Sequence, residues 1–192
     1  MKLIGISGKA GSGKDFLGRL LRRYGYQNVA LAWPLKLEAI KQGFTYEEVF
    51  HTKPEHVRHW LQEHGVWRRQ QNPQHWVQQL ESLMSVLHDQ GGIPNFVITD
   101  LRFPNEYDFI RSRGGKVIRL LHGDRPYPLA GTPAALHVSE TALDGPLYKW
   151  DLRIANGLDM TERKLATALY ATEIIEQRPA LRCTPWPDSS GV

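Results

Sequence analysis

The chain has 192 residues, of which 41% are hydrophobic and 23% are charged, and its formal net charge is +4. This composition is typical of one globular domain with a hydrophobic core, and it argues against a disordered chain or a collagen. Cys183 is the only cysteine, which excludes an intramolecular disulfide scaffold. No stretch approaches the ~18 apolar residues of a membrane span, and the N-terminus turns glycine-rich too early for a signal peptide. We therefore expect a cytoplasmic protein without a membrane partner.

The positive charge is concentrated in the first part of the chain. Residues 1–75 contain 12 Lys and Arg against 6 Asp and Glu, whereas residues 76–192 contain 12 against 14. A basic N-terminal part favours an anionic partner, either nucleotide phosphates or a nucleic-acid backbone. A solvated basic face is the alternative interpretation of the same charge.

Short apolar runs alternate with helical patterns along the chain. Runs typical of strands cover residues 2–7, 28–32, 95–99, 116–121 and 150–155. Helical patterns cover residues 15–24, 34–42, 54–64, 73–90, 104–113 and 160–176. Strands that alternate with helices in this way predict a three-layer α/β fold, with a parallel sheet covered on both faces.

Three segments depart from this alternation. Residues 45–90 contain no strand signal and predict an inserted helical lobe. Residues 122–146 are rich in Gly and Pro and predict a mobile lid. The tail, residues 178–192, contains three prolines and is expected to be loosely ordered. The sequence thus predicts a single domain over residues 1–177, with the lobe and the lid as excursions from it.

The strongest motif follows the first strand and opens the first helix. Residues 8–14 match the pattern G-x-x-x-x-G-K of a phosphate-binding loop (P-loop), in the strand–loop–helix context that the pattern requires. Glycines let successive backbone N–H groups converge on one anion, and the helix N-terminus and a lysine ammonium add positive charge. The residues expected to contact ATP here are Gly8, Ala10, Gly11, Ser12, Gly13 and Lys14.

Asp15 stands where such loops usually have Ser or Thr. The usual hydroxyl binds Mg²⁺ directly. A carboxylate at this position is a charged ligand for the ion or for one of its waters, or an acceptor for a substrate hydrogen bond. Alternatively, Asp15 is a first-turn acid stabilised by the helix dipole.

Five blocks lie in a fixed order along residues 3–157. They are S-G-K-x-G-S-G-K-D at 7–15, A-W-P-L-K at 32–36, K-P-x-x-V-R-x-x-L-Q-x-x-G at 53–65, T-D-L-R-F-P-N-E at 99–106, and H-x-S-E-T-A-L-D at 137–144. In these blocks the chain resembles the phage-type deoxynucleoside monophosphate kinase family. Animal phosphomevalonate kinase is a more distant look-alike that shares the G-K-D loop, and the tail after Gln177 matches nothing.

This resemblance implies ATP-dependent phosphoryl transfer to a deoxynucleoside 5′-monophosphate, giving the diphosphate and ADP. It implies ATP and Mg²⁺ as cofactors, a small-molecule nucleotide as substrate, and the host cytoplasm as compartment if a phage encodes the protein. Transfer between two polyanions requires charge neutralisation and alignment more than covalent chemistry.

Asp100 and Arg102 follow the third predicted strand and are expected at the carboxyl edge of the sheet, beside the P-loop. Asp100 would position Mg²⁺ through water or orient the acceptor phosphate, or else serve only as a turn former. Arg102 would bind a phosphate bidentately. The alternative for Arg102 is an ion pair with Glu106, one helical turn away.

By resemblance the helical lobe binds the monophosphate, through Arg58 and Arg69 more than Arg68, with Gln62 and Trp76 available to the base. Trp76 also fits the apolar stripe of its helix, and this core interpretation is slightly favoured. The other substrate contacts expected from the matched blocks are Lys9, Lys36 and Glu140. In the lid, Arg125 is expected to reach the transferring phosphoryl on closure, and Asn156 is expected near the adenine.

Other chemistries find little support. His51, His56, His59 and His64 cluster in the sequence, but no cysteine or glutamate completes a recognised zinc spacing. Two alternative functions remain. One is a P-loop kinase that phosphorylates an alcohol, for example a hydroxymethylated base in DNA, and the other is a non-catalytic nucleotide- or nucleic-acid-binding regulatory module. The base and the oligomeric state stay open, a homodimer included.

Overall fold

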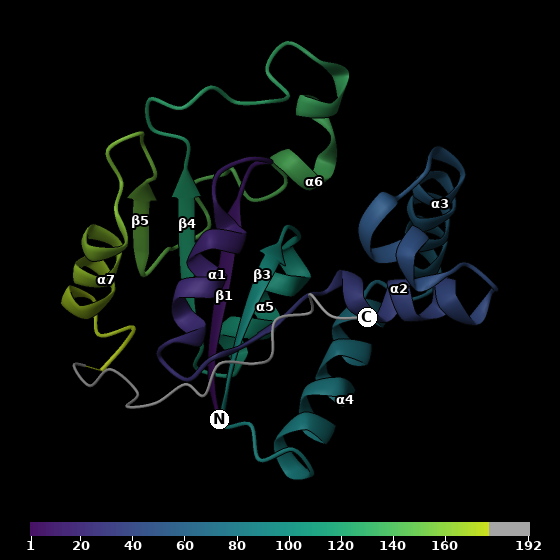
Figure 1. Cartoon of the computed structure of the whole chain (residues 1–192), viewed down its shortest axis with the longest axis horizontal. Helices are drawn as coiled ribbons and strands as arrows, with labels where there is room; N and C mark the ends of the chain where they lie inside the picture. The colour runs from purple at the N-terminus through teal and green to yellow at the C-terminus, as the bar shows by residue number, and fades with distance from the viewer. Residues whose placement is uncertain (177–192) are drawn as a thin grey trace.

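Five strands form one parallel sheet in the computed structural model, which describes residues 1–176 (Figure 1). The strands are β1 (Lys2–Gly8), β2 (Gln27–Val29), β3 (Asn95–Leu101), β4 (Lys116–Leu121) and β5 (Leu152–Ala155). Their order is β2-β3-β1-β4-β5, and every pairing is parallel. This confirms the predicted α/β fold with a parallel sheet. The P-loop follows the central strand, with two strands on either side.

Helices connect the strands and cover the sheet. They are α1 (Lys14–Arg22), α2 (Ala32–Lys41), α3 (Glu55–Gln71), α4 (His75–Asp89), α5 (Pro104–Ser112), α6 (Val138–Thr141) and α7 (Glu162–Ala171). A π-helical turn, η1 (Glu48–Thr52), precedes α3, and a 3-10 turn, η2 (Pro133–Leu136), precedes α6. No helix in residues 1–176 is long and apolar enough to cross a membrane.

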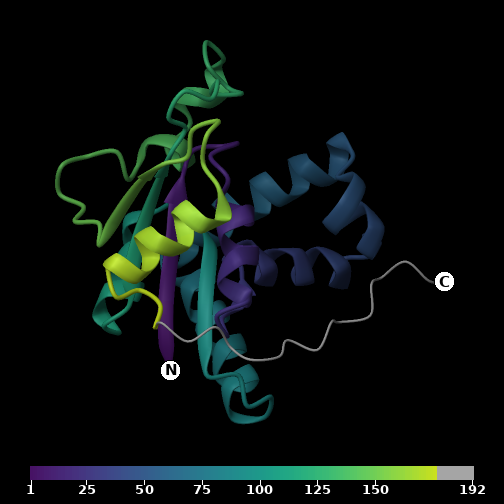
Figure 2. The same cartoon turned by 60° about the vertical axis from the view of Figure 1, so that its left-hand side comes forward.

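The two faces of the sheet have separate cores because side chains alternate along each strand. On one face Ile4 and Ile6 of β1 pack with buried residues of α1 and α7. On the other face Leu3 of β1 packs with Phe96 of β3 and with buried residues of α4 and α5. Figure 2 shows α7 lying across one face of the sheet. The result is three layers, with the carboxyl ends of the strands directed toward α6 (Figure 1).

The helical segment between β2 and β3 divides into two parts. α2, η1 and α3 share a third hydrophobic cluster, centred on Ala39, Val49 and Val57, and extend away from the sheet (Figure 1). α4 instead contributes Leu80 and Met84 to the sheet core. Packing therefore separates α4 from the rest of the segment 45–90, although both parts lack strands.

Element bounds differ from the sequence prediction where tertiary contacts decide them. α3 continues past its expected end at residue 64 to Gln71, and Gly65 lies inside it. A Cβ on Gly65 would lie 3.3 Å from Leu35 Cδ2, so the glycine permits close contact of α2 and α3. α7 is shorter than expected and ends at Ala171. The tail 178–192, with Cys183, lies outside the described residues.

Candidate active site

The P-loop connects β1 to α1 through two glycines in the left-handed region, Gly11 (φ 78°) and Gly13 (φ 92°). A side chain is strained at such angles, so the loop needs glycine there. The Lys14 ammonium folds over the loop and donates to the carbonyl oxygens of Gly8 (2.7 Å) and Lys9 (2.8 Å). Burial and the nearby Arg102 lower the pKa of Lys14 to about 8. A phosphate at the loop would restore the preference of this lysine for its charged form.

Asn156, directly after β5, holds the P-loop through a hydrogen bond to its backbone. It is buried, and its Nδ2 donates to the carbonyl oxygen of Ser12 at 2.8 Å. A Cβ on Gly13 would collide with the Asn156 amide, which is a second reason for glycine at that position. The Ser12 hydroxyl is buried without a hydrogen-bond partner in the described part of the chain. Asn156 is therefore seen to position the loop backbone, while a contact with adenine remains a prediction.

The loop residues fit a nucleotide with Mg²⁺. Within residues 1–176 the Lys14 ammonium forms hydrogen bonds only with neutral carbonyl oxygens, so it is available to phosphate. Asp15 is exposed in the first turn of α1 and has no ion pair in residues 1–176. Mg²⁺ at phosphate sites is usually held by one or two carboxylates together with phosphate oxygens. Within those residues no group of three or more His, Cys, Asp or Glu side chains could hold a metal by itself.

Asp100 lies near the end of β3, and its two carboxylate oxygens accept the backbone N–H groups of Leu31 (2.7 Å) and Ala32 (3.0 Å). It thereby holds the start of α2 against the sheet edge. Burial raises the pKa of Asp100, and these hydrogen bonds and Arg102 oppose that rise. Each oxygen has one backbone partner and keeps a further lone pair, which a water molecule on Mg²⁺ could use, as expected from the sequence.

Arg102 pairs with Glu140 of α6 and not with Glu106. Glu106 is 3% exposed and caps α5, its Oε2 accepting the backbone N–H groups of Arg102 (2.7 Å) and Phe103 (2.9 Å). The expected alternative, an ion pair between the Arg102 and Glu106 side chains, is thus wrong, because the capping geometry directs Glu106 to the backbone. Burial raises the pKa of Glu106 to about 7.

Glu140 binds the P-loop itself. One carboxylate oxygen accepts the Ala10 N–H at 2.8 Å and the Tyr127 hydroxyl at 3.1 Å, while the other contacts Arg102. The side chain of Glu140 is buried. The segment 137–144 therefore lies against the P-loop, and Glu140, expected to contact substrate, contacts protein groups here.

Two cations of the helical segment between β2 and β3 lie toward this edge. The Arg69 guanidinium lies 4.5 Å from the Phe103 ring centre and 3.9 Å from Glu106, and burial lowers its pKa. Lys36 of α2 lies over the Phe50 ring at 4.6 Å, and burial, followed by the nearby Lys53, lowers its pKa.

The other predicted lobe residues are engaged elsewhere. Arg68 pairs with Glu38 at 3.2 Å, together with His64 and His75. Arg58 Nε donates to the carbonyl oxygen of Lys53 at 2.7 Å, and Arg58 and Gln62 line a shallow polar surface pocket. Trp76 is 2% exposed and donates to the Gly65 carbonyl oxygen at 3.2 Å. Its ring is part of the core in this conformation, which leaves no face for a base.

Arg125 Nε donates to the carbonyl oxygen of Gly157 at 3.1 Å, which ties the start of the lid segment to the turn after β5. Sequence reasoning missed Tyr127, His122 and Asp144, which also connect to the loop. His122 Nε2 lies 2.8 Å from the Ala10 carbonyl oxygen, and Asp144 pairs with Lys9 at 3.1 Å. Asp144 closes the fifth sequence block, so its place there was an available signal.

No protein-family model matches the chain, and no curated protein matches it significantly. Among solved structures it is similar to an unliganded sugar kinase from Janibacter sp. HTCC2649, with 16% identity and a TM-score of 0.49 over 91% of this chain and 95% of that one. It is also similar to shikimate kinase from Bacteroides thetaiotaomicron, with 16% identity and a TM-score of 0.39 over 90% of this chain and 97% of that one. Likeness at these values assigns no activity, which has to be inferred from the site.

Proposed function

We propose that the protein is a P-loop phosphotransferase that uses ATP and Mg²⁺ to phosphorylate a deoxynucleoside 5′-monophosphate. One observation carries the proposal. Four basic side chains from separate segments converge on Asp100 and interact electrostatically with its carboxylate: Lys14, Lys36, Arg69 and Arg102. Binding one nucleotide needs the P-loop alone, whereas transfer between two phosphate groups needs a second set of cations facing it.

The roles follow from position. Lys14 and the loop N–H groups would hold the β- and γ-phosphates, and Asp15 would contribute a carboxylate to Mg²⁺. Arg69 and Lys36 lie on the lobe side of the edge and would hold the acceptor phosphate, with Arg102 between the two sites. Mg²⁺ would neutralise charge on the transferring group. Such an arrangement supplies alignment and charge stabilisation, the two requirements of phosphoryl transfer.

Arg125 has a conditional role. It would have to leave the Gly157 carbonyl oxygen to approach the phosphates when the lid segment closes. The deoxynucleotide identity of the acceptor rests on the resemblance of the five sequence blocks.

The test is ADP formation from ATP and Mg²⁺ with each of the four dNMPs, with oligonucleotides that carry normal or hydroxymethylated bases, and with phosphomevalonate. We expect turnover with at least one dNMP. Salt-sensitive phosphorylation of an oligonucleotide alone would instead indicate a DNA kinase. Tight ATP binding without transfer to any acceptor would indicate a non-catalytic module.

A matched pair of variants tests the acceptor side. Arg69→Ala should raise the acceptor KM about tenfold or more with little change in ATP affinity, because it removes a charge-assisted contact to a phosphate. Arg163→Ala removes an exposed arginine of α7, which lies on the far side of the sheet from α2 and α3 (Figure 1), and should leave both constants unchanged. Equal effects of the two substitutions would contradict the placement of the acceptor.

A further inference from the structure

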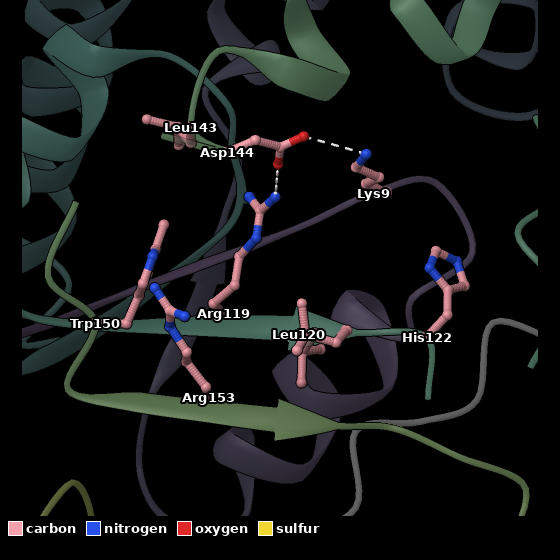
Figure 3. Close-up of a pocket in the computed structure, with 9 residues that line it drawn as sticks. Lys9, Arg119, Leu120, His122, Leu143, Asp144, Trp150 and Arg153 are labelled. Atoms are coloured by element: carbon pink, nitrogen blue, oxygen red, sulfur yellow. Dashed lines mark hydrogen bonds and ion pairs between the residues drawn. The ribbon is translucent and has the colours of Figure 1, made fainter. Parts of the chain in front are cut away.

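A pocket of about 300 Å³ lies beneath the loop that joins α6 to β5, beside the P-loop (Figure 3). Charged and aromatic residues in its lining are Lys9, Arg119, His122, Asp144, Trp150 and Arg153. Side chains alternate between the two faces of a sheet, which explains why Arg119 and Arg153 lie on the same face. Leu120 and Ile154 pack in the α1–α7 core, so Arg119 of β4 and Arg153 of β5 point to the opposite face. None of these residues except Lys9 belongs to the proposed nucleotide or acceptor contacts.

Arg119 is a fixed cation in this pocket. Its side chain is only 10% exposed, one guanidinium nitrogen donates to the Ser7 hydroxyl at 2.8 Å, and another pairs with Asp144. Asp144 is also the partner of Lys9, at 3.1 Å, as the dashed lines in Figure 3 show. One carboxylate is thus shared by two cations, which leaves the pair of cations under-neutralised.

Arg153 adds a third cation. It is the direct register partner of Arg119 on the neighbouring parallel strand, and Figure 3 shows both side chains rising to the same side of the sheet. Within residues 1–176 no carboxylate forms an ion pair with Arg153, which is exposed. Like charges that lie opposite each other on neighbouring strands are destabilising. An anion between them would remove that cost and gain charge-assisted hydrogen bonds.

The pocket therefore contains three basic side chains and one carboxylate, with Trp150 as an aromatic wall whose ring centre lies 5.5 Å from the Arg119 guanidinium. Paired arginines favour planar, bidentate recognition of phosphate oxygens over binding of a monovalent point charge. We propose that this pocket is a second phosphate-binding site, separate from the P-loop, for inorganic phosphate or for the phosphate group of a nucleotide.

The proposal does not depend on the proposed phosphotransfer, because it concerns equilibrium binding and needs no turnover. The experiment uses the full chain with Lys14→Ala, which weakens phosphate binding at the P-loop. Inorganic phosphate is titrated by calorimetry and by the indole N–H signal of Trp150 in ¹H–¹⁵N spectra, assigned with Trp150→Phe. We expect the Lys14→Ala protein to bind phosphate and to shift this signal.

Adding Arg153→Ala to Lys14→Ala should weaken phosphate binding about tenfold or more, since one charge-assisted contact is lost. Arg153→Lys should retain part of the affinity, because it keeps the charge without the fork geometry. Arg163→Ala on the same background is the control and should change nothing. Arg153 is exposed, so its removal should leave the thermal unfolding midpoint nearly unchanged, unlike removal of the buried Arg119.

Two results would overturn the proposal. One is loss of all phosphate binding in Lys14→Ala alone, which would assign the anion to the P-loop. The other is equal affinity of the Lys14→Ala protein with and without Arg153. A parallel titration with a dNMP is followed by the Trp150 signal alone, because the proposed acceptor site at Arg69 also binds a dNMP. At this signal, tighter binding than phosphate supports a nucleotide, and equal binding supports a site for the phosphate group alone.

Discussion

The carboxyl edge of β3 and the junction of α2, α3 and α4 each contain a buried or half-buried glutamate, and they treat its charge in opposite ways. At the junction, Glu38 contacts His64, His75 and Arg68, and its pKa is lowered by these partners although burial acts to raise it. At the edge, Glu106 has mainly backbone N–H partners, and burial raises its pKa to about 7. At the junction the partners of Glu38 stabilise its charged form, whereas at the edge the charged form of Glu106 is disfavoured.

An anion would be stabilised more at the edge than at the junction. The pKa shifts of Lys14, Lys36 and Arg69 all lie in the direction that disfavours charge, and all three side chains are at the edge. Side chains with shifted pKa values concentrate at functional sites because such sites hold charge in readiness for a partner. A polyanion at this edge would stabilise the cations, while nothing comparable is needed at the Glu38 junction.

The largest effect should follow Lys14→Ala at the edge. We expect turnover to fall about 10²–10³-fold, because a preorganised charge toward the phosphates is lost. Circular dichroism should show an intact fold, since the ammonium contacts only two carbonyl oxygens. Lys41→Ala, at the end of α2, is the matched control. Unchanged turnover in Lys14→Ala would contradict the placement of the active site at the edge.

Glu106 should make the free energy of unfolding fall as pH rises, whereas a carboxylate with a lowered pKa makes it rise. Between about pH 4.5 and about 7 the folded protein keeps a proton that the unfolded chain has released. The free energy of unfolding should therefore fall as pH rises through this window, by about 3 kcal/mol at most. Urea unfolding from pH 4.5 to 8 measures the slope.

Glu106→Gln should remove this part of the slope, because its amide oxygen can still accept a backbone N–H but does not titrate. An unchanged slope in the variant would assign the pH dependence to other groups. At the junction the sign is reversed, since the lowered pKa of Glu38 contributes stability at neutral pH that is lost as pH falls through that pKa.

Glu140→Gln should lower the free energy of unfolding by about 1–2 kcal/mol, because Arg102 loses its charged partner while the Ala10 N–H keeps an acceptor. The turnover should fall as well, since Arg102 would no longer be held beside the loop. Chemical denaturation and steady-state kinetics measure the two effects. Glu47→Gln, on an exposed glutamate, serves as control, and equal stability of the two variants would show that Glu140 does not brace the loop.

The smallest effect should come from Arg68→Ala at the junction. Glu38 retains His64 and His75, so we expect a loss of about 0.5 kcal/mol in stability and no change in the acceptor KM. Comparison with Arg69→Ala in the same assay sharpens the distinction between adjacent arginines. An acceptor KM raised equally by both substitutions would place Arg68 in the site.

Much of the fold was predictable because its signals are local. The five strands and the helices between them follow from short-range periodicity, and the parallel sheet follows from their alternation. The extension of α3 past Gly65 was not predictable, because close packing against α2 decides it. The end of α7 at Ala171 was not predicted either. Of the candidate site, the P-loop and its lysine were visible, and the burial of Trp76 agrees with the core interpretation that the apolar stripe of its helix favoured. Its hydrogen-bond partner, the Gly65 carbonyl oxygen, depended on how α4 packs against α3.

The sequence by itself determined the P-loop, since strand, left-handed glycines, lysine and helix are contiguous and their backbone angles are a local property. Only the tertiary structure decided which carboxylate meets which cation. Glu140 reaches Ala10 across 130 residues, and Asp100 reaches Leu31 across 69. Glu106 could pair with Arg102 one turn away, yet its Oε2 caps the backbone instead. A carboxylate binds the donor that the fold brings within about 3 Å, and spacing along the chain does not specify that donor.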